Sequence, residues 1–236
     1  LKSITPHSVD KEIEDDEVII RARFADKAAI SSVVDLKKWS NTWWEIARGV
    51  AMLSKLPPES VRVVGASNGS IILSLATVFG VAKIIALVER EILTFIERVI
   101  GIQIKIEELK ALKLSNESII VGLKEEIETS REEKVKQITT LVVKELHIHE
   151  TADGELLTNF SKAVKGLLEF QEKGGQLDFV VPENEDDANG EPGETGSEAD
   201  RNGELRLSKS QELQQIVSAL RLIEDRIKSV GYEPKP

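Results

Sequence analysis

The pentapeptide Gly65-Ala66-Ser67-Asn68-Gly69 has the residue types and spacing that could present a serine nucleophile on a turn. It satisfies the pattern G-x-S-x-G, in which a serine hydroxyl follows a strand and attacks an acyl group. The apolar run from Val61 to Val64 precedes it, as such a strand would. One candidate chemistry is therefore hydrolysis by Ser67.

The pentapeptide resembles the nucleophile elbow of the α/β-hydrolase family over about ten residues. The resemblance implies several strands before the serine, and an acid and a late histidine after it. Only one clear strand precedes Ser67, and the downstream histidines, His147 and His149, end a highly charged helical stretch. A tight turn explains the motif as well, because Asn68-Gly69 accepts the positive φ angles of a hairpin. We expect the turn and keep the serine hydrolase as an alternative.

His147 and His149 would lie on one side of a strand and so could bind a metal weakly. The third ligand is not evident, and no spacing such as H-E-x-x-H is present. Solvated histidines at a fraying helix end are therefore the preferred explanation of the pair. The chain has no cysteine, which excludes disulfides, thiolate zinc sites and cysteine nucleophiles. We therefore predict no catalytic residue, no cofactor and no metal site.

The formal charge of −10 is concentrated in one stretch of the 236-residue chain. Residues 182–204 hold nine carboxylates against the single Arg201, a local charge of −8, which leaves about −2 for the rest. Lysine and arginine form no block elsewhere, so we expect no nucleic-acid surface. The stretch has four glycines and no aliphatic side chain larger than alanine. It is therefore predicted to be a flexible acidic linker.

Hydrophobic periodicity predicts an α+β fold that is predominantly helical. Alternating residues predict strands at 18–24, 61–66 and 70–78, and spacings of three and four predict helices at 36–53 and 81–99. This β-α-β-β-α order predicts a small sheet covered by helices.

Four regions follow from these elements. They are a small α+β domain at 1–114, a helical region with a short terminal strand at 115–181, the acidic linker at 182–204, and an amphipathic helix at 205–236. A capping box formed by Ser208 and Gln211 marks the start of the last helix.

Residues 69–88 are apolar enough to raise a membrane-associated effector as a second alternative. The charged residues from Glu89 onward, however, predict a polar stripe on the helix that follows, as in a core helix of a water-soluble domain. A hairpin followed by a core helix is therefore the preferred interpretation, and a membrane partner is not expected.

Two features could mediate contacts between proteins. Trp39 and Trp43 share one face of their helix and are expected in the core, whereas Trp44 is turned by about 100° and could meet a partner. The last helix carries an a/d seam of about two and a half heptads. The seam packs either on the chain's own helices or on a second copy. It consists of Leu213, Ile216, Leu220, Ile223, Ile227 and Val230.

The sequence thus predicts a non-enzymatic assembly or adaptor protein of the cytoplasm. A structural component of a larger complex is one form of this prediction. It would act by helix-mediated self-association or by binding a protein partner. The expected contact residues are Trp44 and the six seam residues.

Overall fold

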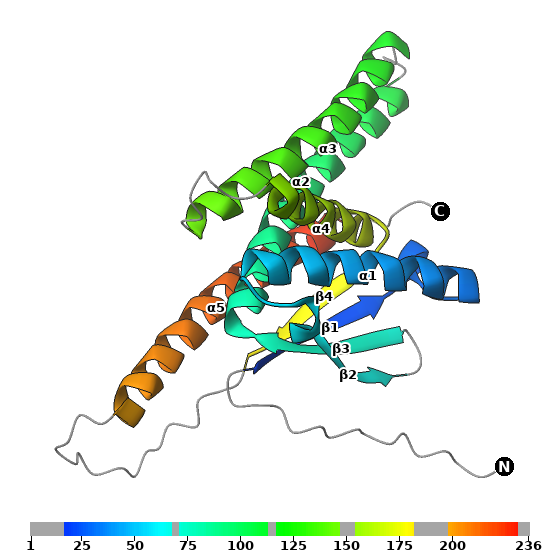
Figure 1. The fold of residues 1–236 in the computed structure, drawn as a ribbon. Helices are drawn as coiled ribbons and strands as arrows, with labels where there is room; N and C mark the ends of the chain where they lie inside the picture. The colour runs from blue at the N-terminus through cyan, green and yellow to red at the C-terminus, as the bar shows by residue number, and fades with distance from the viewer. Residues whose placement is uncertain (1–16, 68–70, 113–116, 147–153, 182–197, 231–236) are drawn as a thin grey trace.

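The computed structural model describes residues 17–67, 71–112, 117–146, 154–181 and 198–230 (Figure 1). The strands are β1 (Glu17–Phe24), β2 (Arg62–Ser67), β3 (Ile71–Val78) and β4 (Gln176–Val180). The helices are α1 (Val33–Leu53), α2 (Phe79–Ala111), α3 (Glu117–Glu145), α4 (Gly154–Glu172) and α5 (Glu198–Ser229), with short 3₁₀ helices at Asp26–Ala28 and Pro58–Ser60. The predominantly helical α+β fold is confirmed.

The four strands form one antiparallel sheet in the order β2-β3-β1-β4. β3 lies between β1 and β2, and β1 lies between β3 and β4, which is the split β-α-β arrangement. The predicted β2–β3 hairpin is confirmed. β4 is an edge strand beside β1, so residues 176–180 pair with a strand that begins at residue 17, far away in the sequence.

One face of this sheet packs against α1 and α4 (Figure 1). Phe24 of β1 lies at the centre of the contact, with ring centroids 5.9 Å from Trp39 and 5.1 Å from Phe170. The ring of Trp43 is 5.4 Å from Phe170. The predicted burial of Trp39 and Trp43 is confirmed, while the neighbouring Trp44 is 53% exposed.

α1 and α4 approach each other closely because two glycines lie in their contact. A Cβ atom at Gly49 would come within 2.5 Å of the carbonyl oxygen of Asn159 and 2.6 Å of the Ala163 Cβ. One at Gly166 would lie 3.2 Å from atoms of Ile46. Larger side chains at either position would push the two helices apart.

α5 packs beside α2 of the same chain, and the two helices run parallel. The ion pairs Lys83–Glu212 (2.6 Å) and Glu97–Arg226 (2.8 Å) each join residues 129 positions apart, so the register is constant between them. The seam faces this contact. Leu213, Ile216, Leu220 and Ile223 are buried, Ile227 is half-buried and Val230 is exposed.

α5 begins at Glu198, seven residues before the predicted start at 205. Residues 198–204, expected in the acidic linker, are therefore helical, and the supposed capping box at Ser208 and Gln211 lies inside the helix. Glu198, Ala199 and Arg201 favour helix, and acidic residues are favourable near a helix N-terminus. The rest of the predicted linker lies outside the described residues.

The apolar run 69–88 is divided between two elements. Ile71–Val78 forms β3, and α2 starts at Phe79, where Val81, Ala82 and Ile84 are buried in the core. Within the part of the chain that the structure describes, no helix is long and apolar enough to cross a membrane. A single hydrophobic cluster includes residues from β1 through α5, so the predicted regions 1–114, 115–181 and 205–236 all contribute to it.

Replacing either buried tryptophan by alanine should destabilise the protein by about 3 to 5 kcal/mol, because a large ring is removed from the sheet–helix contact. Trp44→Ala should cost less than about 1 kcal/mol, because the ring is half in solvent. Denaturant titration of the three variants measures these differences. A larger loss for Trp44→Ala than for Trp39→Ala would contradict the packing.

Leu220→Asp should destabilise the chain by about 3 kcal/mol or more, because a charge enters the buried contact between α2 and α5. Leu222, two residues further on the same helix, is 64% exposed, so Leu222→Asp is the matched control and should change little. Thermal melts compare the two variants. Equal melting temperatures would show that the seam does not pack within the chain.

Candidate functional site

The serine of the G-x-S-x-G motif ends β2, where its backbone pairs with Ile72 of β3. Another antiparallel strand follows Ser67, whereas a nucleophile elbow is followed by a helix. Residues 68–70, His147 and His149 lie outside the described residues. Among the residues that are described, no group of three histidine, aspartate or glutamate side chains is placed to hold a metal ion.

The predicted contact residues fall into two groups. The seam residues Leu213, Ile216, Leu220 and Ile223 are buried where α5 packs on α2 of the same chain, whereas Ile227 is half-buried and Val230 is exposed. Trp44 is on the outer side of α1, where the Arg48 guanidinium lies 5.4 Å from its ring centroid and Arg48 also pairs with Glu155 at 3.1 Å. These contacts restrict the indole while leaving it exposed. Partner binding by either group stays a prediction.

A second surface was not predicted: the hairpin formed by the end of α2 (residues 101–112) and the start of α3 (residues 117–134). This α2–α3 hairpin extends away from the rest of the protein (Figure 1). It carries ten aliphatic residues, of which only Ile106 is buried. They are Ile102, Ile104, Ile106, Leu109, Leu112, Ile119, Ile120, Val121, Leu123 and Ile127.

The base of the hairpin is fixed to the core. The second half of α3 packs in the core through three buried residues, Val135, Ile138 and Val142. The Lys134 ammonium pairs with Glu91 of α2 at 2.9 Å, and Arg98 of α2 pairs with Glu126 of α3 at 3.3 Å. The two helices are therefore held side by side, and their distal aliphatic residues remain partly in solvent.

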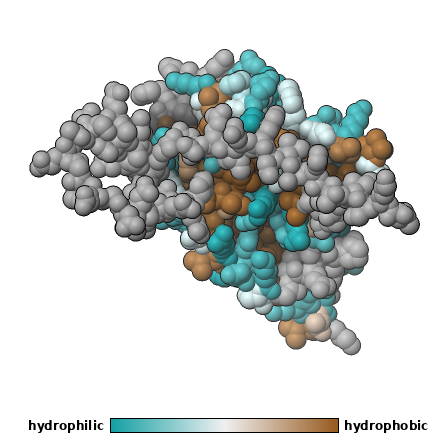
Figure 2. Space-filling model, turned by 90° about the horizontal axis from the view of Figure 1, so that it is seen from below, coloured by the Kyte–Doolittle hydropathy of each residue, from teal (hydrophilic) through white to brown (hydrophobic). Residues whose placement is uncertain are grey.

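Hydrophobic side chains also reach the surface elsewhere. The face seen in Figure 2 shows several separate hydrophobic patches between hydrophilic side chains. Isolated patches of this kind are usual on folded proteins. The end of the hairpin differs because Leu112, Ile119 and Val121, each at least 50% exposed, accompany half-buried neighbours along two adjacent helices.

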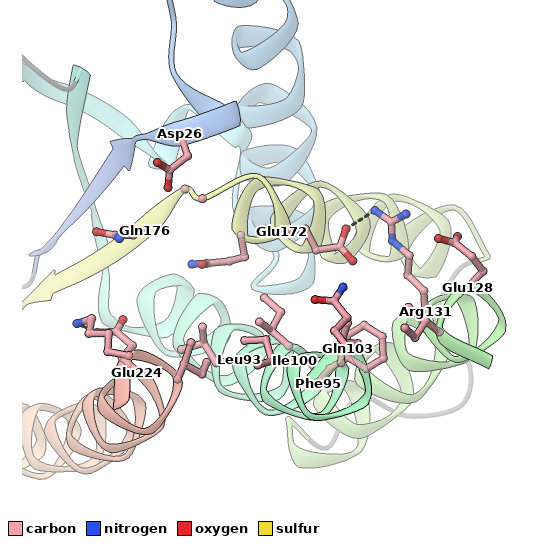
Figure 3. Close-up of a pocket in the computed structure, with 18 residues that line it drawn as sticks. Asp26, Leu93, Phe95, Ile100, Gln103, Glu128, Arg131, Glu172, Gln176 and Glu224 are labelled. Carbon is pink, nitrogen blue, oxygen red and sulfur yellow. Dashed lines mark hydrogen bonds and ion pairs between the residues drawn. The ribbon is translucent and has the colours of Figure 1, made fainter. Parts of the chain in front are cut away.

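A cavity of about 530 Å³ lies where α2, α3 and α5 meet the turn between α4 and β4 (Figure 3). Its apolar lining comes mainly from α2, through Leu93, Ile96, Val99 and Ile100. Three glutamine side chains, Gln103, Gln171 and Gln176, add neutral polar groups. The cavity is therefore amphipathic rather than purely hydrophobic.

Among the residues that the structure describes, four carboxylates and two cations line this cavity. Glu172 pairs with Arg131, and Glu224 pairs with Lys228 at 3.7 Å. Burial raises the pKa of Glu172 and also that of Glu224, and the paired cation opposes the rise in each case. Asp26 and Glu128 complete the set, so the fully ionised lining has a net charge of −2.

Asp26 is placed by two interlocking turns. It has a positive φ of 50°, and Gly174 beside it has a φ of 88°. A Cβ atom at Gly174 would lie 2.5 Å from the Asp26 carboxylate, so glycine is required there for both reasons. The N–H of Ala28 donates to the carbonyl oxygen of Lys173 at 2.8 Å and ties the turns together.

Glu89 of α2 is the most buried ionisable side chain near the cavity, with 1% exposure. The amide of Gln171, a cavity-lining residue, donates a hydrogen bond to one Glu89 oxygen, and the other oxygen has no partner among the described residues. Burial is the main cause that raises the pKa of Glu89 well above its ordinary value, and the charge of Glu224 adds to it. The expected polar stripe therefore does not include Glu89. α4 and α5 both pack near this part of α2 and remove the side chain from solvent.

No protein-family model, curated protein or solved structure matches this chain. The hairpin and the cavity were not predicted, because their residues come from helices that only the fold brings together. A partial signal was the short charged run of Glu89, Arg90 and Glu91 between the apolar stretches Ile84–Val88 and Ile92–Leu93.

Glu89→Gln should stabilise the protein at pH 7 by about 1 to 3 kcal/mol, because a buried amide is neutral without having to hold a proton, whereas the buried carboxyl group must keep one. In the folded wild type, Glu89 keeps its proton at pH values where the unfolded chain has lost it. The free energy of unfolding of wild type therefore falls as pH rises above the ordinary glutamate pKa of about 4.3. The stability that Glu89→Gln gains over wild type should vanish below that pH.

Denaturant titrations at several pH values measure this difference. Glu91→Gln is the control, because Glu91 lies on the same helix but pairs with Lys134, so its replacement should give no gain. A stability difference between Glu89→Gln and wild type that is independent of pH would contradict a protonated Glu89.

Proposed function

We propose that this protein is a non-enzymatic assembly or adaptor protein and that its contact element is the α2–α3 hairpin. The observation that carries the proposal is the row of aliphatic residues on a helical pair that extends from the core with only Ile106 buried. A mean coefficient of about 25 cal/mol per Å² of apolar surface makes covering these residues favourable. Such surfaces commonly mark protein contacts.

A second copy of the chain is the partner that fits best. Two antiparallel helices bury one side of each other and leave the remaining apolar side chains exposed. Two such hairpins can cover these residues together as a four-helix bundle. The contact would be self-complementary under two-fold symmetry, the commonest arrangement of homo-oligomers. Charges of both signs, including Lys105, Glu108, Lys124 and Glu125, are available for pairing at its margin.

The predicted contact residues have a place in the same proposal. The seam from Leu213 to Ile227 fixes α2 and so supports the base of the hairpin. Trp44 supplies a separate anchor for a protein partner, because an exposed indole held by Arg48 loses little conformational freedom on binding.

The proposal includes a cytoplasmic location and a protein, rather than a nucleic acid, as the partner. A chain without cysteine suits a reducing compartment, and the sequence has no block of lysine and arginine that would bind phosphate. The serine hydrolase and the membrane effector have no comparable supporting observation.

The molar mass in solution tests self-association. Wild type should have at least twice the chain mass of 26.1 kDa in light scattering coupled to size exclusion. Ile119→Glu/Val121→Glu should shift the mass toward that of one chain, because two charges enter the apolar contact. Both residues are already exposed, so helical circular dichroism should be retained.

Leu222→Glu is the control, since it adds a charge at an exposed leucine on α5, outside the hairpin. It should keep the mass of wild type. A monomeric wild type at high micromolar concentration, or an equal effect of the control, would contradict assembly through the hairpin.

A further inference from the structure

The cavity between α2, α3, α5 and the α4–β4 turn has the size of a small-molecule site. Its volume of about 530 Å³ lies within the usual range of roughly 300 to 1,000 Å³ for ligand pockets. The base of the hairpin contributes Gln103, Ile127, Glu128 and Arg131 to its lining, whereas Leu112, Ile119 and Val121 at the far end do not line it. Variants at the far end of the hairpin and variants in the cavity therefore test assembly and ligand binding separately.

The aliphatic residues of the cavity form a continuous side. Leu93, Ile96 and Ile100 recur on α2 at spacings of three and four, so they follow one face of the helix. Ile127 of α3 and Ile227 of α5 add aliphatic side chains to the lining from the two neighbouring helices. A ligand lying along α2 would therefore contact hydrocarbon from three helices.

The carboxylates lie around this apolar side rather than in one cluster. Figure 3 shows Glu224 on α5 on one side of the α2 residues, and Glu172 and Glu128 on the other. The carboxylates at the two ends of the cavity belong to different helices, since both α5 and α3 pack against α2. Asp26 lies above the α2 residues in the same view. A ligand that spans the cavity thus meets negative charge at both ends.

We propose that this cavity binds an aliphatic diamine or polyamine, with its methylene chain on the α2 residues and an ammonium group at each end. The carboxylates of Glu224 and Glu128 would each accept hydrogen bonds from one ammonium group. Gln103, Gln171 and Gln176 offer further acceptor oxygens beside the chain.

The charge balance selects this class over others. Arg131 pairs with Glu172, and Lys228 lies 3.7 Å from Glu224, so the four carboxylates and two cations leave a net charge of −2 on the lining. Two ammonium groups would bring this net charge to zero through charge-assisted hydrogen bonds. An anionic ligand would add to the negative charge, and a neutral chain would leave the carboxylates uncompensated.

Isothermal titration calorimetry on the full chain, in buffer with physiological salt, tests the class of ligand. The probes are 1,6-diaminohexane and spermidine, compared with hexylamine, 1,6-hexanediol and adipate. A diamine or spermidine should bind with one site per chain and at least tenfold more tightly than hexylamine, which has one charge. No saturable binding of any amine, or equal binding of the diol or adipate, would overturn the proposal.

Single carboxylate variants test the location. Glu224→Gln and Glu128→Gln should each weaken binding about tenfold, the equivalent of about 1.4 kcal/mol. Glu212→Gln is the matched control, because Glu212 is on α5 but pairs with Lys83 away from the cavity. This variant should bind the diamine with the affinity of wild type. An equal loss in all three variants would show general attraction to an acidic protein and would overturn the site.

A steric variant provides an independent measurement. Val99→Trp places a large ring in the cavity from a half-buried position and should abolish binding, whereas Thr94→Trp, at an exposed position of the same helix, should not. Melting curves establish that each variant is folded. Wild-type affinity in a folded Val99→Trp variant would place the amine elsewhere and overturn the assignment.

Discussion

Phe24 and the rings around it decide how the chain is arranged. Its side of the sheet is apolar and must be covered, and Trp39 from α1 and Phe170 from α4 meet it at edge-to-face angles. Such contacts fix the positions of both helices, because aromatic rings lose much of their contact when shifted. Gly49 then lets α1 and α4 lie close enough for both to reach the sheet. The remaining helices, α2, α3 and α5, pack against the unit formed by the sheet, α1 and α4.

Local pattern predicted most of the elements but not their assembly. The alternation of apolar residues in β1 and their helical spacing around Trp39 indicate which side of each segment is buried. The strand, the helix and their buried sides could therefore be inferred from residues that are neighbours in the sequence. The pairing of Ile20 with Phe179 could not, because it joins residues far apart and depends on α4 returning the chain to the sheet. The capping pattern at Ser208 predicts a later start for α5 than Glu198, because the helix-forming residues before it carry no comparable local signal.

The candidate sites show the same division. The seam of α5 was visible in the sequence, but packing on α2 and packing on a second copy require the same stripe, so only the fold could distinguish them. The charged residues after Glu89 predict a polar stripe that includes it, whereas α4 and α5 bury its side chain. The cavity depends on four separate segments and has no local sequence pattern. The exposed position of Trp44, in contrast, followed from helix geometry alone.

α2 connects the proposed properties. Lys83 and Glu97 tie one stretch of the helix to α5, Leu93 and Ile100 line the cavity, and the last turns form half of the hairpin. A ligand that contacts Glu128 of α3 and Glu224 of α5 would restrain the angle at which the hairpin leaves the body. If that angle differs between the free chain and the assembly, linkage requires the two equilibria to be coupled equally in both directions. The size of the coupling would be set by how far the position of α3 differs between those two states.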